Sequence, residues 1–111
     1  MFTLNLFAAN FLAEAASFLL NEGASYLESN AAEYEAKVEP VAYNGIDAAA
    51  SAIKAALDSK ADPLRFILGG AIDHAVDSLD AEAKAALGNE APKLVAGLVA
   101  AMRAEAAKLV A

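Results

Sequence analysis

Residues 2–21 carry an unusually wide apolar surface if they form a helix. On a helical wheel at about 100° per residue, most polar side chains gather within an arc of roughly 60°. They are Thr3, Asn10, Glu14, Ser17 and Asn21, and Asn5 is the polar residue outside the arc. An ordinary surface helix has an apolar stripe only a little over about 100° wide. We therefore expect this helix to be surrounded by a multi-helix core, a partner subunit or a membrane boundary.

The large apolar side chains of this helix are the candidate interface. The three tyrosines further along the chain, Tyr26, Tyr34 and Tyr43, could be interface anchors because tyrosine is enriched at protein interfaces, and the first two are added to the candidate interface. These tyrosines could equally cap a core within the chain. The candidate interface residues are Phe2, Leu4, Phe7, Phe11, Leu12, Phe18, Leu19, Tyr26 and Tyr34.

Glycine and serine predict where the first helix ends. Gly23 is expected to end it, because glycine is common just past a helix end. Ser25 and Glu28 then fit a capping box that begins a second, acidic helix reaching about Val38. The alternative is one long kinked helix that passes through Gly23.

Residues 46–111 predict further helices after a Pro- and Gly-containing linker at residues 40–45. The first stripe consists of Ile46, Ala50, Ile53 and Leu57. Asp62-Pro63 is a helix start signal, and the pair Gly69-Gly70 in the next helix suggests close approach of another helix or a kink. A short helix at residues 80–87 should end at Gly88. The last helix should begin near Glu90 and present one face, made of Leu94, Leu98, Ala101, Met102, Glu105 and Leu109.

These segments together predict an all-α fold, a helical bundle of five to six helices. Glycine and proline number only 6 and 3, and no stretch alternates convincingly with the two-residue period of a strand. We expect an acidic N-terminal helical hairpin at residues 1–39, a linker at 40–45 and a C-terminal bundle of paired helices at 46–111. A faint 30-residue repeat aligns residues 46–75 with 76–105, a pattern that also arises by chance in an alanine-rich chain.

The charge of the chain narrows the possible partners. The net charge is −7, which disfavours binding to nucleic acid or to an anionic membrane surface. The chain has no cysteine, so neither disulfides nor thiol chemistry is available. Residues 2–21 have the length of a transmembrane span, but Glu14 within them is costly in a bilayer.

The sequence offers little that resembles a catalytic or metal site. His74 is the single histidine, and Asp77 follows at helical spacing, so the two could meet one cation. A solvated acidic face explains the same residues better, because one histidine with carboxylates is too few for the usual ligand sets. No nucleophile or phosphate-loop motif is present. We therefore expect no enzyme activity, no cofactor, no metal and no small-molecule substrate.

The functional hypothesis is a non-enzymatic structural protein. It would assemble with copies of itself or with other protein subunits of a larger particle, plausibly a virus or bacteriophage virion. The alternative is a membrane-active or pore-forming protein whose helix 2–21 lies in or crosses a bilayer. The cellular location stays open: no signal peptide is recognisable, and both a virus particle and the cytoplasm are compatible with the sequence.

Overall fold

A computed structural model describes the backbone of residues 2–59 and 63–110 and the side chains of residues 12–59 and 68–110. The described residues form helices and no strand, which confirms the predicted all-α class. The elements are α1 (Phe2–Ser29), α2 (Ala31–Val38), the 3-10 helix η1 (Glu39–Asn44), α3 (Ile46–Asp58), α4 (Pro63–Asp77), α5 (Ala81–Ala86) and α6 (Ala91–Leu109).

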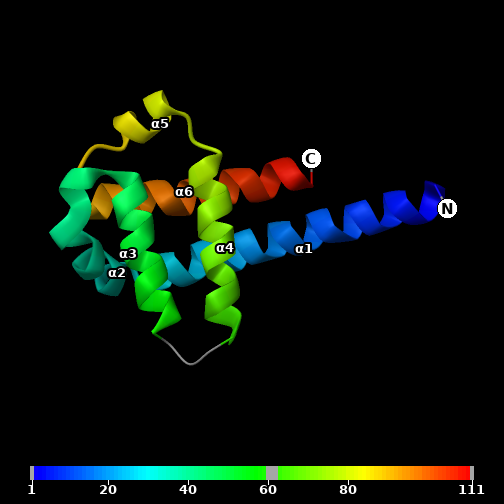
Figure 1. Cartoon of the computed structure of the whole chain (residues 1–111), viewed down its shortest axis with the longest axis horizontal. Coiled ribbons are helices and arrows are strands. Elements are labelled where there is room, and N and C mark those ends of the chain that lie inside the picture. Colours follow the sequence, from blue (N-terminus) through cyan, green and yellow to red (C-terminus); the bar gives the residue numbers. More distant parts are fainter. Residues whose placement is uncertain (1, 60–62, 111) are drawn as a thin grey trace.

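The longest helices, α1 and α6, lie side by side and run in opposite directions (Figure 1). α3 and α4 form a second pair that crosses them, and α2 and η1 close one end of the bundle. α5 lies on the outside and buries no residue. The N-terminal end of α1 extends past the C-terminal end of α6 (Figure 1). The molecule is therefore elongated, with principal extents of 51 × 35 × 18 Å.

One hydrophobic core joins α1, α2, η1, α3, α4 and α6. Its largest fully buried side chains come from each α-helix of this group. They are Tyr34, Leu20, Leu27, Ile46, Ile53, Leu57, Ile72, Leu94, Leu98, Met102, Val38 and Val95. The division of the chain at residues 40–45 stays a prediction. η1 occupies this segment, and its Ala42 reaches the common core.

The predicted end of the first helix at Gly23 is wrong. α1 continues through Gly23 to Ser29, as in the alternative of one long helix. Gly23 is buried against α6 and α4, where an added Cβ would lie 2.5 Å from Met102 Cε. The glycine therefore allows close helix packing in place of a helix end. The break comes at Asn30, whose side-chain amide donates to the Tyr26 carbonyl at 2.9 Å.

The Ser25–Glu28 capping box is also wrong, because both residues lie within α1 with exposed side chains. Glu28 pairs with Arg103 instead. A serine followed three residues later by glutamate is equally compatible with an exposed helical face, so the motif alone could not locate a helix start.

The apolar stripes of the C-terminal helices are confirmed. α3 buries Ile46, Ala50, Ile53 and Leu57, together with Ala49. On α6 the predicted face buries Leu94, Leu98, Ala101 and Met102. Asp62 lies outside the described residues, and α4 begins at Pro63 as expected.

The close helix approach expected at Gly69-Gly70 is not observed. A Cβ on Gly70 would meet nothing within 4 Å, and one on Gly69 would only touch the Lys54 side chain at 4.0 Å. The close contact instead occurs at Gly97 of α6, where a Cβ would overlap the Leu87 side chain.

Candidate interaction surfaces

α1 divides into a part that is packed into the bundle and a part that projects from it. From Ser17 onward, Leu20, Ala24 and Leu27 are buried in the common core. The Ser17 hydroxyl donates to the Ala106 carbonyl of α6 at 2.9 Å. Ser17, a member of the polar stripe of this helix, therefore faces inward against α6.

α1 exposes large apolar side chains in both of its parts. Leu12 lies before the packed part and is 66% exposed; within the packed part, Phe18 is 61% exposed and Leu19 is half-buried. The side chains of Phe2, Leu4, Phe7 and Phe11 lie outside the described residues, and the sequence makes this end of the helix predominantly apolar. This end is also the part of α1 that extends beyond α6 (Figure 1).

An apolar pocket of about 380 Å³ lies beside the middle of α1. It is formed where α1, α4 and α6 meet. Its lining residues are Ala16, Leu19, Leu20, Gly70, Ala71, His74 and Leu109. Exposed Leu12 and Phe18 and this pocket thus belong to the same helix, within about two helical turns of each other.

The two tyrosines of the candidate interface lie against or inside the chain's own core. Tyr34 is fully buried, and its hydroxyl donates to the Tyr26 hydroxyl at 3.1 Å. The rings meet edge to face with centroids 5.8 Å apart. Tyr34 therefore caps an intramolecular core and is not available to a partner, and Tyr26 packs against the same core. Tyr43, the third tyrosine considered as a possible interface anchor, is 73% exposed.

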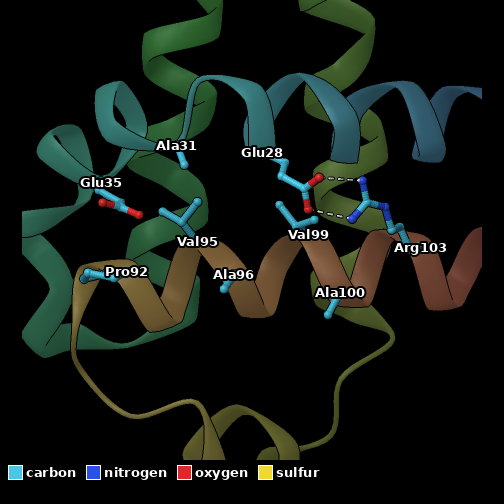
Figure 2. Close-up of a pocket in the computed structure, with 9 residues that line it drawn as sticks. All are labelled: Glu28, Ala31, Glu35, Pro92, Val95, Ala96, Val99, Ala100 and Arg103. Carbon is cyan, nitrogen blue, oxygen red and sulfur yellow. Dashed lines mark hydrogen bonds and ion pairs between the residues drawn. The ribbon is translucent and has the colours of Figure 1, made fainter.

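A second hollow, of about 500 Å³, lies between α6 and the junction of α1 with α2 (Figure 2). Its lining is mostly alanine and valine, with Pro92 at one end. The charged residues on its edge are Glu28, Glu35 and Arg103. No sequence pattern indicates this groove, because it forms only where residues far apart in the chain are brought together.

Glu28 and Arg103 form a two-point ion pair at the end of this groove (Figure 2). Arg103 Nη1 lies 2.8 Å from Glu28 Oε2, and Nη2 lies 3.2 Å from Oε1. These hydrogen bonds, and then the guanidinium charge, hold the pKa of Glu28 below its ordinary value of 4.5. The same bonds raise the pKa of Arg103. Bidentate geometry fixes both side chains more firmly than a single contact would.

His74 lies on α4 next to α6, apart from any cluster of ligands among the described residues. Its Nε2 is 3.4 Å from Glu105 Oε1, and neighbouring Asp73 pairs with Lys54. Within the described part of the chain, no three His, Cys, Asp or Glu residues are placed to hold one metal ion. A search of the described helices also finds none that is long and apolar enough to cross a membrane.

No protein-family model matches the chain, and neither a curated protein nor a solved structure shows significant similarity to it.

Proposed function

We propose that this chain is a non-enzymatic assembly subunit that associates with a second copy of itself through the N-terminal part of α1. The observation that carries this proposal is the apolar exposure along α1, whose N-terminal end extends beyond α6 and whose Leu12 and Phe18 are 66% and 61% exposed. Isolated apolar residues on a surface are ordinary, but clustered ones mark interaction sites. Here they continue into a helix end that is apolar by sequence.

The packed part of α1 supports the proposal because it holds the projecting part in place. Leu20, Ala24 and Leu27 are anchored in the core, and Ser17 is hydrogen-bonded to α6. A rigid surface loses less conformational freedom on binding than a flexible one. α1 therefore leaves the bundle from an anchored stretch of helix.

The chain also contains a complementary partner for its own projecting end. The apolar pocket at Ala16, Leu19 and Leu109 lies beside the middle of the same helix. In a two-fold symmetric pair, each surface patch faces the corresponding patch of the other copy. Two antiparallel α1 helices would thus place each projecting end across the pocket of the other copy.

Charge also favours contact through this helix. Two chains of net charge −7 repel each other, but residues 2–21 contain a single ionisable side chain, Glu14. Repulsion between two copies is therefore smallest where these segments meet. Within this class of function, a component of a virus or bacteriophage particle is the finer hypothesis.

Sedimentation equilibrium without detergent tests the proposal. We expect the unmodified chain to form dimers or larger species at protein concentrations on the order of 100 µM. The double variant Leu12→Gln/Phe18→Gln should weaken association at least about tenfold, because each large apolar side chain contributes roughly 1.5–3 kcal/mol when buried. Tyr43→Gln removes an exposed aromatic ring from η1 and should leave association unchanged.

A monodisperse monomer at that concentration would refute self-association. Flotation with phosphatidylcholine vesicles separates protein docking from lipid docking, since the same residues could enter a lipid surface. We expect the protein to stay in the aqueous fraction. Flotation that is lost in the Leu12→Gln/Phe18→Gln variant would replace the proposal with membrane binding.

A further inference from the structure

A groove with a small apolar lining runs along the seam between α2 and α6. The hollow drawn in Figure 2 adjoins a second hollow of about 510 Å³, and the two share Glu35 and Pro92. On α6 the lining extends from Ala91 to Arg103, a distance of about 18 Å at 1.5 Å per helical residue. The groove is long enough for three turns of a partner helix.

The lining residues determine which side chains can fill the groove. Five exposed or half-buried alanines line it, and Val95 and Val99 form a mostly buried floor. The alanines are Ala31, Ala32, Ala36, Ala96 and Ala100. Because these side chains are short, a ligand must supply the large apolar groups. An amphipathic helix with Leu, Met or Phe at i, i+3 or i+4, and i+7 has this form.

The rim of the groove carries two carboxylates beyond those that form ion pairs within the chain. Glu28 is neutralised by Arg103, and Glu90 lies 3.5 Å from Lys93. Among the described residues, Glu35 and Glu39 have no ion-pair partner. Glu35 is half-buried and points across the groove toward Val95 (Figure 2). A partner with Lys or Arg at the edge of its apolar face would complement these two carboxylates.

We propose that the α2–α6 groove binds an amphipathic, basic helix of a protein partner. The apolar face of that helix would lie on the alanine lining, and its Lys or Arg side chains would pair with Glu35 and Glu39. This groove is separate from the docking surface of α1, because the two share no lining residue. Peptide binding at the groove can therefore be absent while self-association through α1 is observed, and the reverse.

Fluorescence anisotropy with a labelled amphipathic Leu/Lys peptide of about 18 residues, or five helical turns, tests the proposal on the full chain. We expect a dissociation constant on the order of 10 µM in about 0.1 M salt. A peptide of the same pattern with Glu in place of Lys should bind at least about tenfold more weakly, because its charges would face the carboxylates of the rim.

Two matched pairs of variants separate the groove from general charge attraction. Glu35→Gln/Glu39→Gln should weaken binding about three- to tenfold, as expected for two rim ion pairs. Asp58→Asn/Asp77→Asn removes the same charge at the C-terminal ends of α3 and α4 and should leave affinity unchanged within about twofold.

The second pair of variants tests whether a bulky side chain in the groove blocks peptide binding. Ala96 lines the groove and is exposed, so Ala96→Trp should abolish peptide binding without unfolding the chain. Ala104 is exposed on the same helix outside the groove, and Ala104→Trp should bind like the unmodified chain. Equal weakening by the two charge variants, or normal binding by Ala96→Trp, would overturn the proposal. Self-association that is lost in Ala96→Trp while peptide binding persists would assign the groove to contacts between copies and would overturn it as well.

Discussion

Replacing Ser17 by alanine removes a hydrogen bond that joins the packed part of α1 to the end of α6. The Ser17 hydroxyl donates to the Ala106 carbonyl at 2.9 Å, and both residues are buried, at 6% and 1% exposure. Ala106 lies in the last turn of α6, which ends at Leu109. In Ser17→Ala this carbonyl loses its donor in a place that solvent reaches poorly.

The expected cost follows from the two groups involved. A net hydrogen bond contributes about 0.5–1.5 kcal/mol, and an unsatisfied buried acceptor costs about 1–3 kcal/mol. Alanine has a higher helix propensity than serine, which returns up to about 0.5 kcal/mol. We therefore expect the free energy of unfolding to fall by about 1–2 kcal/mol, and Tm to fall by roughly 4–10 °C for a chain of this size.

Urea and thermal unfolding followed by circular dichroism measure this loss. Ser25→Ala is the matched control, because Ser25 is exposed on the same helix. Its free energy of unfolding should change by no more than about 0.5 kcal/mol. If Ser17→Ala and Ser25→Ala were equally stable, the hydrogen bond to Ala106 would not anchor α1, and the inward orientation of Ser17 would be wrong.

The other expectations concern the two parts of α1, the groove ion pair and the tyrosine pair. Leu20→Ala should lower the free energy of unfolding by about 2–5 kcal/mol. Leu12→Ala at low protein concentration should change it by less than about 0.5 kcal/mol. Similar losses for the two variants in urea unfolding would contradict the division of α1 into a packed and a projecting part. Because Arg103 lowers the pKa of folded Glu28, the stabilisation by this pair is present above the ordinary value of 4.5 and is lost as pH falls through the lowered pKa. Carboxyl NMR should show this lowered pKa, and Arg103→Gln should return it to the ordinary value; an unchanged pKa would exclude the ion pair in solution. Tyr34→Phe should lower the free energy of unfolding by about 0.5–1.5 kcal/mol through loss of its bond to Tyr26, and a neutral effect by calorimetry would show that this bond is not formed.

Periodicity was sufficient to predict the buried faces of α3 and α6. Ile53 and Leu57, and Leu94 and Leu98, recur at helical spacing, and each of them is buried. Such stripes depend on neighbours along the chain, so a sequence contains the information needed to find them.

Glycine was a poor guide because its role depends on what packs against it. Gly23 ends no helix, since Met102 and Leu68 approach it from other helices. Conversely, a Cβ added at Gly70 would meet no atom within 4 Å. The difference between these glycines comes from residues distant in sequence, which composition and spacing do not reveal.

The candidate interface was predicted only in part for a related reason. The helical wheel distinguishes polar Ser17 from apolar Leu12 and Phe18, but it does not show which of these side chains lies against α6. Ser17 is buried because it meets a helix-terminal carbonyl, while Phe18, next to it in sequence, is exposed. Tyr34 was ambiguous in sequence, and only the packing of α2 on α3 and α6 assigns it to the core.

The most direct test of the proposed docking role uses the absence of cysteine from the chain. A nitroxide spin label at Leu12→Cys would report on the projecting part of α1, and one at Tyr43→Cys on an exposed site elsewhere. As protein concentration rises from about 1 µM to the order of 100 µM, we expect the label at position 12 to become immobilised while the label at position 43 stays mobile. If the label at position 12 were as mobile at the highest concentration as at the lowest, the claim that α1 binds another copy of the chain would be contradicted.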